Sequence, residues 1–247
     1  MRRKILKLTS VVAIIFIFTS CTTTSKWTYP PDPTHLIKLY DTPKLPLKIA
    51  VLPFKDNRRN HNTMATLYLG YIPLFPFGYV EYDRPDTQRA FVTIGSTGGP
   101  AYIFNPPEDV AKAVTRSLNE SGIFKEAYFS YGGDETADLI LSGEVDSTLY
   151  NGKIFTYGLS FVGPCLWSLG LPSGSSNNEL EVKLSLLTRD NKKIWEYNVE
   201  DKASVLHGRY YNWGFDNDGY AEILLIGMNK AIQDLNEKII SNKLLLK

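Results

Sequence analysis

The sequence predicts an α+β fold in which one mixed, mainly antiparallel sheet is covered by two helices. Three observations lead to this prediction. Residues 47–54 form a nearly continuous apolar run, which fits a strand buried on both faces. Leucine and valine alternate with other residues over 180–186, which fits a half-buried strand. Apolar residues recur at helical spacing after Asn105 and again after Gly219.

The elements follow one another in an order that suits such a sheet. The first helix is predicted to start after Asn105, a good N-cap residue, with Pro106 at its first position and Gly122 as its stop. A tight turn at residues 189–192 makes the segment after it the hairpin partner of the strand before it. The remaining predicted strands and the last helix lie at 124–130, 138–150, 180–186, 194–205 and 219–242.

The first 20 residues form a secretory signal peptide. A basic start is followed by the wholly apolar run 11–18 and then by Thr19, Ser20 and Cys21. A cysteine directly after two small residues resembles the signal of bacterial lipoproteins, although Phe18 replaces the usual aliphatic residue. The resemblance implies cleavage before Cys21, a diacylglycerol thioether on its sulfur and acylation of its new amino group. The alternative is an ordinary signal peptide with an incidental cysteine. An uncleaved anchor is disfavoured, because a spanning helix needs about 20 apolar residues.

Residues 21–46 are predicted to be a lipidated tether rich in threonine and proline, and residues 47–247 a single periplasmic domain. Several acyl chains would attach the protein durably to a membrane. The residue after Cys21 is Thr22 rather than aspartate, which in Gram-negative lipoproteins points to the outer membrane. The sequence therefore predicts a lipid-anchored protein of the cell outer membrane that faces the periplasm.

Composition narrows the range of partners. Removing the signal takes four of the 27 basic residues, which leaves 23 against 26 acidic ones, a balance of −3. This charge gives no support for nucleic-acid binding. Cys165 is the only other cysteine, so lipidation of Cys21 would leave neither an intramolecular disulfide nor a cysteine-based zinc cluster. We expect Cys165 to be buried.

Three short stretches resemble a known superfamily. They are residues 49–54, 137–144 and 193–197. Together with the order of elements, they resemble the superfamily of the curli-export lipoproteins and the TolB amino-terminal domain. The resemblance implies a non-enzymatic protein that forms a secretion pore, activates a cell-wall synthase or assists envelope transport. It supplies no catalytic residue.

Two apolar insertions depart from that common core, at residues 66–79 and 154–171. The second has no charged residue, but its glycines and proline argue against a simple helix. Both insertions either fold back over the sheet to complete the core or touch lipid or a neighbouring subunit. For the second case, the predicted contact residues are Tyr71, Leu74, Phe75, Phe77, Phe161, Leu166 and Trp167.

A third segment, residues 207–215, combines aromatic side chains with an arginine. Such residues are common anchors of binding surfaces. The alternative is that the aromatics pack on the end of the sheet. The predicted contacts to a partner protein or glycan are Arg209, Tyr210, Tyr211, Trp213 and Phe215.

The sequence contains no recognisable catalytic or metal-binding motif. The three histidines lack ligand spacing, and neither a nucleophile elbow nor a phosphate-binding loop is present. We therefore predict no catalytic residue, no metal and no cofactor. The predicted function is an envelope assembly or transport accessory that binds protein or glycan. A subunit of an oligomeric export pore is the first alternative, and an envelope enzyme of unrecognised type is the second.

Overall fold

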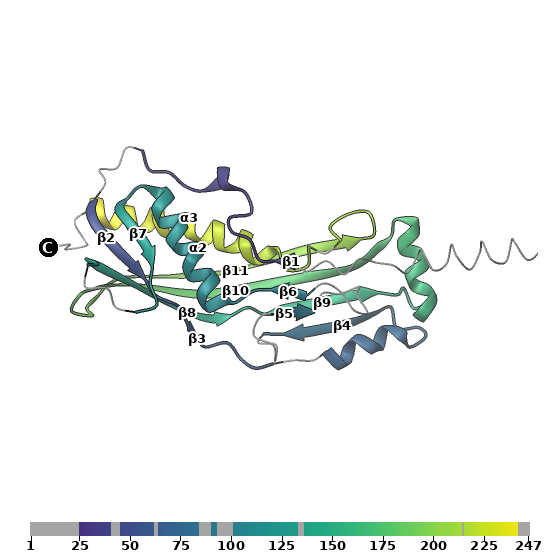
Figure 1. The fold of residues 1–247 in the computed structure, drawn as a ribbon. Coiled ribbons are helices and arrows are strands. Elements are labelled where there is room, and N and C mark those ends of the chain that lie inside the picture. The colour runs from purple at the N-terminus through teal and green to yellow at the C-terminus, as the bar shows by residue number, and fades with distance from the viewer. Residues whose placement is uncertain are drawn as a thin grey trace, which may run out of the picture.

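The structure is a computed structural model that describes residues 25–40, 45–61, 64–83, 90–92, 101–132, 136–213 and 215–241. The predicted signal peptide and Cys21 lie outside these residues. The described chain is an elongated α+β molecule, in which two helices lie over one part of a long, twisted sheet (Figure 1).

The main sheet is mixed, as predicted. In the described chain its strands follow the order β4 (Phe77–Tyr82), β9 (Tyr150–Phe155), β10 (Pro172–Thr188), β8 (Leu139–Ser147), β2 (Leu45–Val51) and β7 (Phe124–Phe129). The strand β11 (Lys193–Gly208) runs antiparallel along β10, and β3 (Lys55–Asp56) pairs with β8. The pairings of β2 with β7 and β8, and of β3 with β8, are parallel, whereas those among β4, β9, β10, β8 and β11 are antiparallel.

The hydrophobic core lies between this sheet and the helices α2 (Pro106–Ser121) and α3 (Gly219–Ile240). Every second side chain of β10 faces the helices, from Leu180 to Leu186, and each of these is almost completely buried. The intervening side chains are partly exposed on the other face, which explains the alternation seen in the sequence. Burial of this many aliphatic and aromatic groups is the main stabilising contribution to the fold.

Both ends of α2 lie where the sequence predicts, with Asn105 at the N-cap position. Pro106 is the first helical residue, and Gly122 ends the helix in the left-handed conformation at φ 78°. Asn105, however, makes no side-chain cap bond. Instead, its backbone N–H donates to the carboxylate of Asp109 at 2.7 Å, so an acid in the first turn caps the helix.

The predicted tether is wrong for residues 25–40. Trp27, Tyr29 and Leu36 are buried in the core, and Trp27 stacks on Phe104 at a ring-centroid distance of 5.0 Å. Residues 25–26 also form strand β1 (Ser25–Lys26), which joins β6 (Ala101–Ile103) and β5 (Ala90–Val92) in a small second sheet. The prolines suggested a linker, but aromatic side chains between them bury enough apolar surface to order the segment.

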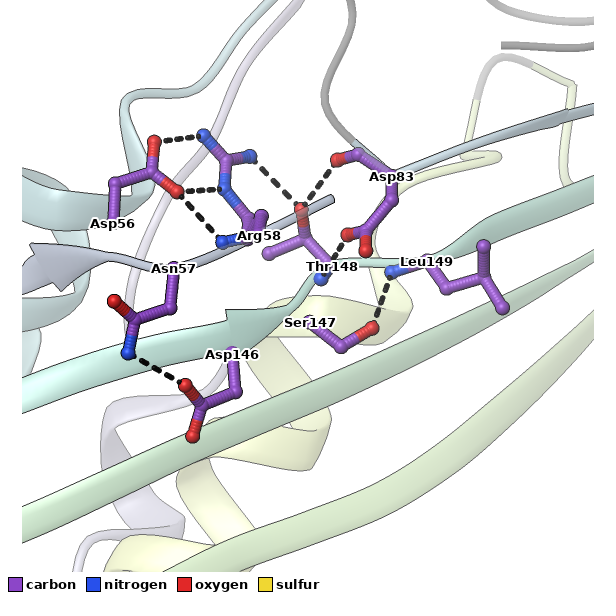
Figure 2. A network of polar contacts seen from close by, with 8 residues as sticks. All are labelled: Asp56, Asn57, Arg58, Asp83, Asp146, Ser147, Thr148 and Leu149. Atoms are coloured by element: carbon purple, nitrogen blue, oxygen red, sulfur yellow. Dashed lines mark hydrogen bonds and ion pairs between the residues drawn. The ribbon is translucent and has the colours of Figure 1, made fainter. Parts of the chain in front are cut away.

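A buried polar network, which we call the joint, connects the helix-covered part to the strand pair β4–β9. The Arg58 guanidinium donates two hydrogen bonds to the carboxylate of Asp56, both 2.9 Å, and a third to the hydroxyl of Thr148, also 2.9 Å (Figure 2). The backbone N–H of Thr148 donates to the carboxylate of Asp83 at 2.8 Å (Figure 2). The backbone carbonyl of Thr148 accepts a hydrogen bond from the hydroxyl of Tyr220, at the start of α3. Thr148, which lies between β8 and β9, is thus held by hydrogen bonds from three sides.

Candidate functional site

The two apolar insertions fold into short 3₁₀-helices at one end of the molecule. They are η2 (Met64–Tyr71), which precedes β4, and η3 (Ser160–Leu169), which connects β9 to β10. Figure 1 shows both at the end opposite to the C-terminal end of α3, η2 in blue and η3 in green. We call residues 68–77 and 157–171 the apolar tip.

Hydrogen bonds hold the two halves of the apolar tip together. The Thr156 hydroxyl donates to the carbonyl of Gly70 at 2.8 Å, and the backbone N–H of Leu74 donates to the carbonyl of Gly158 at 3.0 Å. The Ser160 hydroxyl donates to the carbonyl of Tyr71. Segments about 85 residues apart in sequence therefore form one surface.

Close packing supports these bonds. Tyr71 stacks on Phe161 with ring centroids 5.0 Å apart. Gly163 lies so near the backbone of Thr156 that a Cβ atom there would stand 2.6 Å from the Thr156 Cα. A larger residue at position 163 would force η3 away from β9.

The aromatic loop, residues 209–215, joins the same surface. The Arg209 guanidinium donates to the Ser168 hydroxyl at 2.6 Å, and the Tyr210 hydroxyl donates to the Ser168 carbonyl at 2.9 Å. Trp213 lies beside Trp167, at a ring-centroid distance of 6.4 Å. The three segments that the sequence singled out thus meet at one end of the molecule.

Large apolar and aromatic side chains are exposed across this end. In the apolar tip they are Tyr68, Ile72, Leu74, Phe75, Phe77, Leu159, Phe161, Val162, Leu169 and Leu171. In the aromatic loop they are Tyr210, Tyr211, Trp213 and Phe215. The exposed fractions reach 89% for Leu74 and 76% for Phe161. Exposed patches of this kind mark interaction surfaces.

The placement bears on the alternative that the insertions complete the core. The prediction that the insertions complete the core is wrong for Leu74, Phe75, Phe77 and Phe161, which are exposed. The predicted contact residues Tyr71, Leu166 and Trp167 are half-buried beneath them. The alternative that the loop aromatics pack on the end of the sheet holds for Tyr211, whose ring lies against Gly208 at the end of β11, whereas Tyr210, Trp213 and Phe215 are more exposed.

Cys165 is exposed on η3, which corrects the expectation that it is buried. The helix lies beyond the end of the sheet, where α2 and α3 do not reach (Figure 1). An apolar sequence around a cysteine therefore does not guarantee burial when no second layer covers the segment.

A buried polar cluster near the start of α3 escaped the sequence analysis. His207 Nε2 lies 2.7 Å from the Ser176 hydroxyl and 3.5 Å from a carboxylate oxygen of Asp216. This resembles a serine–histidine–aspartate arrangement, but Ser176 is fully buried and His207 Nδ1 bonds the carbonyl of Asn212 instead of the carboxylate. Ser176, His207 and Asp216 are all buried, so this arrangement presents no exposed nucleophile. Sequence spacing could not reveal it, because β10, β11 and the following turn each supply one residue.

Burial raises the pKa of Asp216 to about 6, with the nearby His207 acting in the opposite direction. The carboxylate has little contact with solvent, so its charged form is disfavoured. The titration of Asp216 therefore makes the free energy of unfolding depend on pH.

A pocket of about 640 Å³ lies beside the joint and is lined mainly by acidic side chains. Its lining includes Glu81, Asp83, Asp146, Glu179 and Glu181, with Arg59 and His61 at one side. Burial raises the pKa of Glu181, and its acidic neighbour Asp146 raises it further. The described residues contain no group of three or more histidine, cysteine or acidic side chains placed to hold a metal ion.

Within the part of the chain that the structure describes, no helix has both the length and the apolar character needed to cross a membrane.

The comparisons with known proteins give distant structural likenesses. No protein-family model and no curated protein matches the sequence. A crystal structure from Xanthomonas campestris, described with family DUF330, aligns with 90% of this chain and 98% of its own at 10% identity and a TM-score of 0.42. A minor lipoprotein from Acinetobacter baumannii aligns with 82% of this chain and 96% of its own at 11% identity and a TM-score of 0.32.

These values are too low to transfer a function to this chain. Neither structure is described as a curli-export or TolB protein, so that resemblance stays a prediction. The fold is a mixed α+β architecture, and large apolar side chains are exposed at the apolar tip and the aromatic loop.

Proposed function

We propose that this protein is a non-enzymatic, lipid-anchored envelope lipoprotein that assists assembly or transport by binding a partner protein at the membrane. Cys21 is the proposed attachment point, and the aromatic loop is the proposed contact with the partner. The observation that carries the proposal is the meeting of three exposed apolar segments at one end of the molecule.

The aromatic loop has the features of a protein contact. Trp213, Tyr210 and Tyr211 expose large side chains with polar edges, and Arg209 lies beside them. Tryptophan, tyrosine and arginine are enriched among residues that dominate binding energy. Arg209 and Tyr210 are also held by their bonds to Ser168, so little side-chain freedom remains to be lost on binding.

The test is co-purification from an envelope fraction in mild detergent. We expect one distinct envelope protein to accompany the full-length chain, and Trp213→Ala to reduce its amount at least severalfold. The matched control is Tyr40→Ala, which also removes an exposed aromatic side chain but lies in the amino-terminal segment. Equal recovery from wild type and Trp213→Ala would contradict the proposed contact.

Light scattering on the same preparations tests the first alternative. A large, defined oligomer without a second protein would favour the export pore over the accessory function. A monomer in detergent would argue against the pore.

A further inference from the structure

We infer that the apolar tip inserts into the outer part of the hydrocarbon region of a lipid bilayer. The inference rests on the proposed envelope location and names a second partner, lipid, for the apolar tip, which adjoins the aromatic loop. Three properties favour lipid over a protein: the internal backbone hydrogen bonds of the apolar tip, its lack of charge and the closeness of the predicted anchor to the folded domain.

Several backbone N–H groups of the apolar tip donate hydrogen bonds within the tip. The N–H groups of Ile72 and Phe75 donate to carbonyls three residues earlier, at 3.1 and 3.2 Å. Those of Val162 and Gly170 do the same at 3.1 Å each, and that of Leu171 donates to the carbonyl of Leu166 at 3.3 Å. Pro73, Pro76 and Pro164 have no N–H to satisfy.

This property matters because a bilayer interior offers no hydrogen-bond partners, so an unsatisfied backbone group there costs several kcal/mol. Protein interfaces, in contrast, use about one hydrogen bond per 100–200 Å². The surface of the apolar tip therefore suits contact with lipid acyl chains, which form no hydrogen bonds.

The charges also match a membrane. Residues 68–77 and 157–171 contain no charged side chain. Two cations border the apolar tip among the described residues: the Arg209 guanidinium donates to the Ser168 hydroxyl, and the Lys153 ammonium lies 5.2 Å from the ring centre of Phe77. Tyr210 and Trp213 of the aromatic loop lie beside Ser168 and Trp167. Apolar side chains beyond a ring of aromatic and basic ones are typical of segments that enter the membrane interface.

The predicted lipid anchor is close to the folded domain. Only three residues separate Cys21 from Ser25, where β1 begins, so the two Cα atoms are at most about 14 Å apart. In Figure 1, β1 lies farther towards the apolar tip than β2, β7 and α2 do. A lipid on Cys21 would thus hold the folded domain close to the bilayer.

Cys165 makes the inference testable with a native probe on η3. Full-length protein, extracted in mild detergent, is reconstituted into vesicles of phosphatidylethanolamine and phosphatidylglycerol and treated with a membrane-impermeant maleimide. We expect Cys165 to react at least about tenfold more slowly in wild type than in the double variant Leu74→Ser/Phe161→Ser, which removes two inserted side chains. The control Tyr40→Ser/Ile240→Ser changes two exposed residues away from the apolar tip and should react as wild type does.

A second measurement separates lipid contact from protein contact. Vesicles with brominated acyl chains should quench the emission of Trp167 and Trp213 in wild type, and less in the double variant. Fast labelling of Cys165 in wild type without quenching would overturn the inference and favour a protein partner. Protection without quenching would overturn it as well and indicate self-association.

The same samples separate this inference from the proposed function. Mass spectrometry of the peptide that contains position 21 reads the modification of Cys21. An unmodified Cys21 would contradict the proposed lipid anchor, while quenching by brominated lipid would still support the inserted tip.

Discussion

The joint and the apolar tip distribute polar and apolar groups in opposite ways. At the joint, the charged side chain of Arg58 is buried and fully paired with Asp56 and Thr148. At the apolar tip, Leu74 and Phe161 are exposed to water although their side chains are apolar. A buried charge is tolerated where it connects elements, whereas an exposed leucine at the end of a molecule adds nothing to folding. The joint therefore contributes to stability, whereas the exposed side chains of the apolar tip contribute little to it.

The largest expected effect comes from breaking the joint. Arg58→Met removes the guanidinium that bonds the partly buried carboxylate of Asp56 and the buried hydroxyl of Thr148. We expect the free energy of unfolding to fall by about 3–5 kcal/mol, measured by urea denaturation. Arg59→Met, at the exposed neighbour, should change it by less than about 0.5 kcal/mol. A loss below about 1 kcal/mol for Arg58→Met would show that the joint does not stabilise the fold.

A smaller loss is expected where the apolar tip meets the sheet. Gly163→Ala places a Cβ atom against the backbone of Thr156 and should lower the free energy of unfolding by about 1–3 kcal/mol. Gly132→Ala is the matched control, because a Cβ atom there meets nothing within 4 Å. Equal stability of the two variants would mean that η3 is not packed on β9 as described.

The pH dependence of stability tests the buried cluster at the start of α3. The pKa of Asp216 is about 6 in the folded protein and 3.8 as its ordinary value, so the folded state binds more protons between these pH values. The contribution of Asp216 to stability therefore decreases as pH rises through this window.

Asp216→Asn removes that contribution. Its free energy of unfolding relative to wild type should rise between pH 4 and 6.5 by on the order of 1–3 kcal/mol and then level off. Urea denaturation at several pH values measures this difference, and Asp190→Asn in the exposed turn is the control. A difference that does not change with pH would show that Asp216 is not titrating in this range.

The smallest effect is expected at the surface of the apolar tip. Leu74→Ser should change the free energy of unfolding by less than about 0.5 kcal/mol, because its side chain is 89% exposed. Val182→Ser, at a core position of β10, is the contrasting variant and should lose about 2–4 kcal/mol. A large loss for Leu74→Ser would mean that the apolar tip belongs to the core after all.

Local patterns were sufficient for the elements that form the centre of the fold. Alternation over residues 180–186 predicted a strand with one buried face, and the apolar stripe after Gly219 predicted a helix. In both cases the side-chain period matches the geometry of one element. The pairing of β10 with β11 also followed from the turn that joins them.

Patterns were insufficient where polar residues occupy buried positions. Residues 172–179 are small and polar, yet they form the first half of β10. Ser176 and Asn178 face inward there and are completely buried near the start of α3. The edge strand β4 and its neighbour β9 were also missed, because their pairing joins segments about 70 residues apart.

By itself, the sequence determined the α+β class, the two covering helices and the three segments suited to interaction, because each depends on residue type and short-range periodicity. Only the tertiary structure decided that these segments meet at one end, that Trp27 and Tyr29 belong to the core, and that Thr148 bonds Arg58, Asp83 and Tyr220. These outcomes depend on contacts between residues distant in the chain. Whether an apolar side chain is covered is likewise set by the layers around it, which its neighbours in sequence do not specify.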